Sequence, residues 1–177
     1  MKYNGPHTFI PAVTLVGPRL TLVPLDMTQP DSPETIALFD QLFTAVSNSE
    51  ELFQYMTLGP FKSADELRAH YQRICSLPIG CQPDKRVELG SVWIGAYLML
   101  CHAFENGRAE VQRVEWTAHH LNVASQQTAL KIGFVYEGTF RKHRFYKNTV
   151  RNSFWYSIID DEWAEKKERL QKMLNII

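Results

Sequence analysis

The sequence predicts one domain of the α/β or α+β class. Segments with strand patterns and segments with helix patterns alternate along the 177 residues. No internal repeat, low-complexity tract or linker divides them. The apolar fraction of 45% suffices for a sizeable core in a chain of this length. We therefore expect a single domain that spans residues 1–177.

The first half opens with a strand and continues with two helices. Alternation after Gly17-Pro18 predicts a strand over residues 19–25 (RLTLVPL). Apolar spacing predicts a helix over residues 31–46. The sequence SADE at residues 63–66 is a capping box. The apolar residues that follow it recur at i, i+4 and i+7, which predicts one buried helix face: Leu67, Tyr71 and Ile74.

The centre of the chain has a strand, helix, strand pattern after the turn-rich sequence LPIGCQP. Residues 86–94 (RVELGSVWI) predict a strand, and Gly95 leads directly into a helix over residues 96–105. Residues 111–118 (VQRVEWTA) predict a second buried strand. Because one short crossover joins them, we expect the strands at residues 87–94 and 111–118 to be parallel neighbours.

The C-terminal part starts with a short helix between Asn122 and Gly133, which suit a helix N-cap and C-cap. Strands follow at residues 134–140, 141–146 and 150–159, and the last two form a predicted hairpin joined by residues 147–149. Acidic residues at the start and basic residues later predict a final helix over residues 160–174.

Charge and composition exclude several classes of protein. Nineteen basic and nineteen acidic residues balance, so net charge does not draw the chain to nucleic acid or to an anionic membrane. The first residues lack the pattern of a signal peptide, and no window approaches the roughly 18 apolar residues of a membrane span. The three cysteines have no CxxC or zinc-site spacing, which favours reduced thiols and a cytoplasmic location: Cys75, Cys81 and Cys101.

Asn122 and Ser125 have two interpretations. The first is local, since an Asx side chain commonly caps a helix and a serine in the first turn is commonly exposed. The second is functional, because a hydroxyl beside free amides at the positive end of a helix suits a bound acceptor or a developing negative charge. The spacing alone leaves both open.

A set of motifs in fixed order carries a family resemblance. Between residues 87 and 163 the chain reads VELGSVW, AFE, RVEWTAHHLNVAS, ALKIGFVYEGTFRKH and WYSIIDDEW. These motifs resemble the acyl-CoA N-acyltransferases of the GNAT superfamily, in particular the RimJ/RimL branch of ribosomal-protein N-terminal acetyltransferases. The earlier pieces GPRLTLVPL and FQYMTLGPF resemble that branch's opening strand and substrate-side loop. The resemblance spans residues 16–163.

The resemblance implies a fold and a reaction. It implies a GNAT-like mixed sheet flanked by helices, here with a shortened central crossover helix. It implies transfer of an acetyl group from acetyl-CoA to a primary amine, either a protein N-terminus or a small molecule, by direct attack on the thioester. By match to the NxxS motif, Asn122 hydrogen-bonds the pantetheine arm and Ser125 protonates the departing thiolate.

The predicted strand at residues 86–94 carries the other expected site residues. The resemblance implies that Val92 and Trp93 offer backbone amides to the pantetheine and to the thioester carbonyl, as an oxyanion hole does. Glu88 is a candidate general base, directly or through water. The alternative for Glu88 is an edge carboxylate paired with Arg86 or Arg113.

The sequence departs from the family where the phosphates bind. Relatives have a Q/R-x-x-G-x-G/A loop before the central helix, whereas Gly95 is followed here at once by AYLMLCHAFE. A helix of ten residues spans about 15 Å, at about 1.5 Å per residue, and the preceding strand spans about 26 to 30 Å. We therefore expect weak acetyl-CoA binding. The alternative function is a degenerate GNAT-like interaction module without CoA binding, or an incomplete gene model of an active enzyme.

Three histidines and a basic run complete the candidates. The branch's catalytic glutamate falls near Arg144, so His143 is either a base or a stacking residue of the hairpin. His119 and His120 should point to opposite faces as strand neighbours, so we expect no metal site. The run RKHRFYK is a solvated face, a rim for a CoA phosphate, or a nucleic-acid contact, the last being least favoured in a neutral protein. The acceptor amine and the oligomeric state are not indicated.

Overall fold

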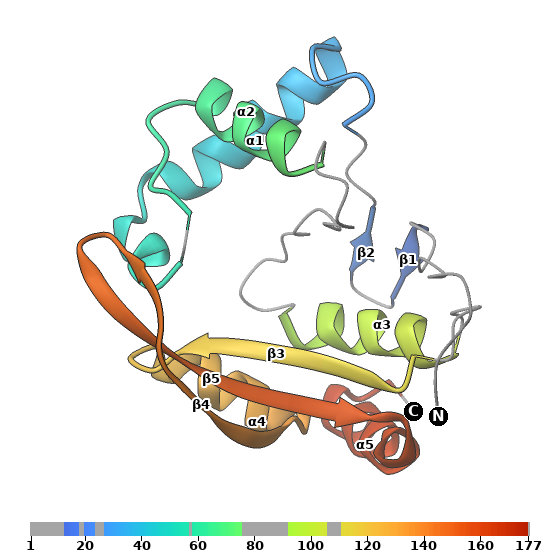
Figure 1. The fold of residues 1–177 in the computed structure, drawn as a ribbon. Coiled ribbons are helices and arrows are strands. Elements are labelled where there is room, and N and C mark those ends of the chain that lie inside the picture. Colours follow the sequence, from blue (N-terminus) through green and yellow to red (C-terminus); the bar gives the residue numbers. More distant parts are fainter. Residues whose placement is uncertain are drawn as a thin grey trace, which may run out of the picture. The chain divides into compact units, whose positions relative to one another are not determined.

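The computed structural model describes residues 13–17, 20–23, 27–56, 58–75, 92–105 and 111–176. The chain divides into two compact units, one made of Met1–Val23 with Arg86–Ile177 and the other of Pro24–Lys85 (Figure 1). The predicted organisation as a single domain stays a prediction. Within the described residues, no helix combines the length and apolarity that crossing a membrane requires.

The smaller unit is a pair of helices, α1 (Pro33–Ser47) and α2 (Ala64–Cys75), with a 3₁₀ helix, η1 (Glu50–Phe53), between them. The Ser63 hydroxyl accepts a hydrogen bond from the Glu66 amide at 3.1 Å, which confirms the cap of α2. The buried side chains on the two helices form their core: Phe39, Leu67 and Tyr71. Both helices were predicted by the apolar spacing.

Within the described residues, the larger unit contains two small sheets and three helices. The antiparallel pair β1 (Leu15–Val16) and β2 (Thr21–Leu22) precedes α3 (Val92–Glu105). The remaining elements follow in chain order: β3 (Arg113–His119), α4 (Val123–Ile132), β4 (Val135–Tyr146), β5 (Thr149–Ile159) and α5 (Asp160–Leu174). The second sheet has the order β3-β5-β4, with both pairs antiparallel. This arrangement of strands and helices confirms the predicted α/β or α+β class.

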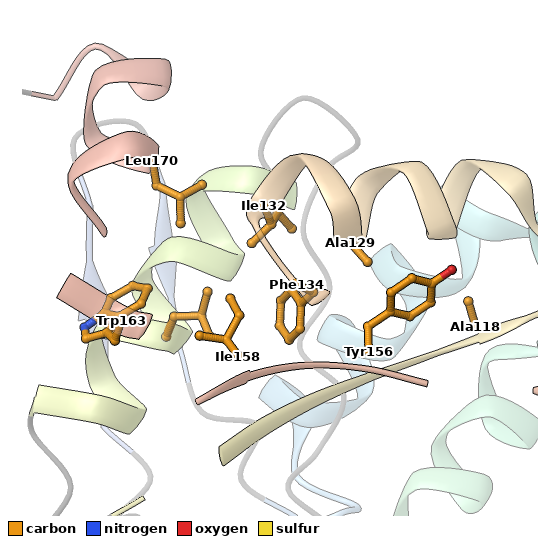
Figure 2. Packing of buried hydrophobic residues seen from close by; sticks show 9 residues of the cluster. Ala118, Ala129, Ile132, Phe134, Tyr156, Ile158, Trp163 and Leu170 are labelled. Carbon is orange, nitrogen blue, oxygen red and sulfur yellow. The ribbon is translucent and has the colours of Figure 1, made fainter. Parts of the chain in front are cut away.

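Alternating residues on one face of this sheet pack on the helices. Tyr156 and Ile158 of β5 lie against side chains of α4 and α5 (Figure 2). Figure 2 shows the cluster they form with Ala118, Ala129, Ile132, Phe134, Trp163 and Leu170. Leu100 brings α3 into the same cluster, and the rings of Phe104 and Trp163 stack with centroids 5.3 Å apart. One core therefore joins the sheet to three helices.

The predicted strand at residues 86–94 is wrong where it can be checked. Val92, Trp93 and Ile94 form the first turn of α3, and residues 86–91 lie outside the described residues. The helix has 14 residues instead of the ten predicted, with Gly95 buried inside it. A short apolar run rich in β-branched and aromatic residues fits a buried helix as well as a buried strand.

The predicted parallel pairing does not hold for residues 92–94, and the rest of that prediction falls on residues 87–91, outside the described residues. Residues 92–94 cannot pair as a strand because they are helical. In the described part of the chain β3 pairs with β5 and runs antiparallel to it, with Arg113 opposite Ile159 and His119 opposite Ser153. The rule that a short crossover joins parallel neighbours holds only for two strands of one sheet, and the first expected strand does not extend to residue 94.

The C-terminal hairpin is confirmed, with one long strand in place of two. Lys147 and Asn148 have φ values of 48° and 57°, as a tight two-residue hairpin turn requires. Strand β4 runs continuously through residues 135–146 and contains two register shifts. At the second one Lys142 has φ 51°, and its amide donates to Asn152 Oδ1 at 2.7 Å. The final helix has the predicted bounds.

Candidate functional site

The candidate site lies where β3 ends and α4 begins. Asn122 Oδ1 accepts a hydrogen bond from the Ser125 amide at 3.0 Å, so Asn122 is the N-cap. Gly133 ends the helix with φ 114°, a left-handed conformation that suits glycine. The local interpretation of Asn122 is therefore confirmed. This cap uses the backbone of Ser125 and leaves its hydroxyl to other partners.

The hydroxyl of Ser125 bonds to an indole from the neighbouring strand. Trp116 Nε1 on β3 donates to Ser125 Oγ at 3.1 Å. An indole nitrogen only donates, so the serine oxygen is the acceptor in this bond, and its own hydrogen can go to a second partner. Ser125 is half-buried. The side chain is thus both held in place and able to act as a donor.

A third side chain closes the junction between strand and helix. Gln126 Nε2 donates to the carbonyl oxygens of His119, at 3.1 Å, and His120, at 2.9 Å. These two bonds satisfy carbonyls at the point where the sheet ladder stops. Asn122, Trp116 and Gln126 together fix the start of α4 against the end of β3.

The two adjacent histidines do not point to opposite faces, so that expectation is wrong. Their rings stack with centroids 4.6 Å apart and planes 17° apart. Strand β3 ends at His119, and His120 begins a turn, where strand alternation no longer applies. The Leu121 amide donates to His119 Nδ1 at 3.0 Å. Burial lowers the pKa of His119, and electrostatic interaction with His120 and Arg151 lowers it further.

The described residues contain no group of three or more His, Cys, Asp or Glu side chains that could hold a metal ion. His143 is instead part of the hairpin. Its Nδ1 lies 3.0 Å from Ser153 Oγ, which also accepts a hydrogen bond from Arg151 Nε at 3.0 Å. The His143 ring lies edge-on to that of Phe140 and tilted to that of Trp155, so it packs among the aromatic side chains of the hairpin.

The expected oxyanion-hole residues occupy a different element from the one predicted. Val92 and Trp93 lie in the first turn of α3, where backbone amides have no partner within the helix. Lys131 Nζ of α4 lies 5.5 Å from the centroid of the Trp93 ring. Their amides therefore belong to a helix N-terminus and not to a splayed strand. Glu88, the expected base, lies outside the described residues.

An ion network that the sequence did not reveal crosses the sheet. Arg113 on β3 donates to Glu115 at 2.8 Å and to Glu137 on β4 at 2.9 Å, and Ser157 on β5 also donates to Glu137. Glu137 is the extra residue of a bulge between Tyr136 and Gly138. The hydrogen bond from Arg113 lowers the pKa of Glu137, and that from Ser157 adds to it. The carboxylates of Glu115 and Glu137 therefore both bind Arg113.

The arrangement was compared with known proteins. No protein-family model matches the sequence, and no curated protein is significantly similar to it. Solved structures do match. A GCN5-related N-acetyltransferase from Brucella melitensis is 18% identical, with a TM-score of 0.74 over 92% of this chain and 85% of the other. The chain has the fold of the GCN5-related N-acetyltransferases.

Two further structures support this fold. A GNAT-family acetyltransferase from Bacillus anthracis is 16% identical, with a TM-score of 0.63 over 85% of this chain and 100% of the other. RimJ from Mycobacterium smegmatis, solved with CoA-disulfide, is 12% identical, with a TM-score of 0.62 over 86% of this chain and 88% of the other. At these identities the likeness extends to the N-acetyltransferase fold and not to the RimJ/RimL branch.

Sequence reasoning missed Trp116 and Gln126 as site residues. The motif RVEW contains Trp116, and the predicted helix after Asn122 contains Gln126, but neither pattern indicates a role in the site. Their partners are six to nine residues away, across a strand, turn and helix junction in this N-acetyltransferase fold. The sequence offers one signal for Trp116: when a tryptophan is buried, its indole N–H needs a hydrogen-bond acceptor.

Proposed function

We propose that this protein is an N-acetyltransferase that transfers the acetyl group of acetyl-CoA to a primary amine, as RimJ/RimL-type enzymes do. One observation carries the proposal: the Ser125 hydroxyl is held at the N-terminus of α4 as a hydrogen-bond acceptor for Trp116, which leaves its own proton to be donated. The fold, shared with GCN5-related N-acetyltransferases, supports it. The NxxS motif supports the proposal because it resembles the motif that contains the serine in that family.

Acetyl-CoA supplies a thioester that the amine attacks directly, without an acetyl-enzyme intermediate. Ser125 donates its proton to the sulfur as the carbon–sulfur bond breaks, and the positive end of α4 lowers the cost of negative charge there. Asn122 orients the pantetheine arm, since its Oδ1 is used by the cap while its amide NH₂ can donate.

The remaining parts of the proposed site are the first turn of α3 and Glu88. The amides of the first turn of α3, including those of Val92 and Trp93, would face the pantetheine or the pyrophosphate. Glu88 would accept the proton that the attacking amine loses, directly or through water. A cytoplasmic location belongs to the same proposal, and it is favoured by the three cysteines without disulfide or zinc spacing.

The second candidate function is an interaction module that has lost CoA binding. It is favoured by one observation, the absence from the sequence of the Q/R-x-x-G-x-G/A loop before α3. Such a module would keep the fold and the cap of α4 but would release no CoA.

Calorimetric titration with acetyl-CoA separates the two functions. We expect saturable binding, together with release of free CoA thiol when peptides with a free N-terminus, amino acids or polyamines are supplied as acceptors. Titration with desulfo-CoA shows how much the sulfur contributes. If no heat appears at millimolar acetyl-CoA and no thiol is released with any acceptor, the transferase proposal is wrong and the interaction module stands.

A further inference from the structure

We infer that Trp116 is a positioning residue of the acetyl-transfer site, which aims the Ser125 proton at the sulfur of acetyl-CoA. This inference rests on the proposed function. It goes beyond it by assigning a role to a side chain on the neighbouring strand. Trp116 acts through Ser125, because its indole N–H donates to the Ser125 hydroxyl.

The direction of the bond between the two side chains decides the role of each. A serine hydroxyl that both donates and accepts can rotate to suit any neighbour. The Trp116 indole has one polar hydrogen and no acceptor, so at 3.1 Å it occupies a lone pair of Ser125 Oγ. The Ser125 amide is already used by Asn122 Oδ1 at 3.0 Å. The hydroxyl proton therefore points away from Trp116.

The indole is held by rigid surroundings. Trp116 lies within strand β3, directly opposite Tyr156 of β5. Its ring is tilted against that of Phe134, with centroids 5.7 Å apart, and it packs against the main core cluster. The two bonds from Gln126 to the carbonyls after β3 hold the other side of the junction. A donor on such a support keeps its position during a reaction, as preorganised stabilisation requires.

The bond between Trp116 and Ser125 also stabilises the negative charge that develops during the reaction. When the carbon–sulfur bond breaks, its electron pair goes to the sulfur, which takes the proton from Ser125 Oγ, and solvent later returns that proton. Negative charge builds on Oγ during the transfer. The Trp116 N–H and the N-terminus of α4 both face this charge, and a hydrogen bond to a charged oxygen is stronger than one to a neutral oxygen.

The competing explanation is structural. A buried indole N–H needs an acceptor, and Ser125 could serve only that need. Trp163 offers a matched control because its Nε1 donates to Glu105 Oε1 at 2.7 Å and its ring belongs to the same core cluster. Trp163→Phe removes a bond to a carboxylate, which is at least as strong as the bond that Trp116→Phe removes.

Steady-state kinetics test the inference. We expect Trp116→Phe to lower kcat by about 3- to 30-fold with the KM for acetyl-CoA changed by less than about twofold, since one hydrogen bond that strengthens in the transition state is lost. Trp163→Phe should change kcat by less than about twofold. In a Ser125→Ala background Trp116→Phe should add less than about twofold, because the bond is already gone.

A second readout does not depend on activity. The four tryptophans give four indole N–H signals in a ¹H–¹⁵N spectrum, and Trp116→Phe and Trp163→Phe assign two of them. We expect the Trp116 signal to move in Ser125→Ala and to move when CoA is added to the wild-type protein. The Trp163 signal should stay in place in both experiments.

The outcomes separate this inference from the proposed function. If the wild-type protein transfers acetyl groups while Trp116→Phe is as active as Trp163→Phe, the positioning role is wrong and the transferase stands. A Trp116 signal that does not move in Ser125→Ala leads to the same conclusion. A protein that neither binds CoA nor releases it overturns both. A loss of kcat in Trp116→Phe that depends on Ser125 supports both.

Discussion

Arg113 on β3 reaches Glu137 on β4 across the central strand β5, and the guanidinium donates to the carboxylate at 2.9 Å. The contact is possible because Glu137 is the extra residue of a bulge in β4. The same carboxylate accepts from Ser157 of the strand between them. One acidic side chain thereby ties together all three strands of this sheet.

Glu137→Gln should destabilise the protein in a pH-dependent way. The hydrogen bond from Arg113 holds the pKa of Glu137 below its ordinary value of 4.5. A carboxyl with a depressed folded-state pKa contributes stability above its unfolded pKa, and this contribution is lost as pH falls through the folded pKa. We expect the melting temperature of Glu137→Gln to lie below that of the wild type at pH 7 and the difference to shrink below about pH 4.

Glu115→Gln is the matched control for that experiment. Glu115 accepts from the same Arg113 at 2.8 Å, but this bond lies within strand β3, and the Glu115 side chain is about as exposed as that of Glu137, 45% against 42%. We expect Glu115→Gln to lower the melting temperature less than Glu137→Gln does, because an exposed ion pair within one strand contributes little and joins no two strands. Equal melting temperatures for both variants at pH 7 would contradict the bridging role of Glu137.

Asn122→Ala should lower the free energy of unfolding by about 1 kcal/mol, because the Ser125 amide loses its capping acceptor. Urea denaturation measures the change. Asn122→Asp keeps the acceptor and should stay close to the wild type in stability. It removes the side-chain NH₂, however, and should weaken acetyl-CoA binding. An aspartate variant with unchanged acetyl-CoA affinity would leave Asn122 with the capping role alone.

Ser125→Ala should lower turnover much more than it weakens acetyl-CoA binding. The proposed donation to sulfur is made late, in the transition state, and loss of one general acid costs about 100-fold. The capping bond uses the backbone amide of residue 125, so alanine keeps the helix start. Single-turnover rates with saturating acetyl-CoA make the measurement. Equal rates for Ser125→Ala and the wild type would sink the proposed role.

Acetyl-CoA affinity should rise when a relative's Q/R-x-x-G-x-G/A segment is inserted. The insertion belongs before Val92, because α3 begins there and Gly95 is buried within it. If two or three charge-assisted hydrogen bonds to phosphate are gained, the change is about 2 to 4 kcal/mol, or about 30- to 1000-fold. A scrambled segment of equal length is the control. Micromolar binding by the unmodified chain, with no gain on insertion, would show that another surface holds the phosphates.

The elements whose ends are marked by neighbouring residues, such as helix caps and turn residues, could be predicted from the sequence. Asn122 and Gly133 bound α4, as the predicted caps required. Lys147 and Asn148 form the predicted hairpin turn, and α5 begins and ends as predicted. In each case the deciding hydrogen bonds or backbone angles involve residues within about four positions of one another, so neighbouring residues contain the information.

The tertiary structure decided the elements and contacts that depend on distant residues. A short apolar run can be buried either as a helix or as a strand, and the elements that cover it decide between the two. Val92 and Trp93 are helical, and Leu100 of the same helix packs on strands that follow later in the chain. The motif NxxS indicated Ser125, but the bond that orients its hydroxyl comes from Trp116, beyond the turn that joins β3 to α4. Caps are local hydrogen bonds that a short segment makes alone, whereas burial and cross-element bonds exist only once the sheet and its helices have packed.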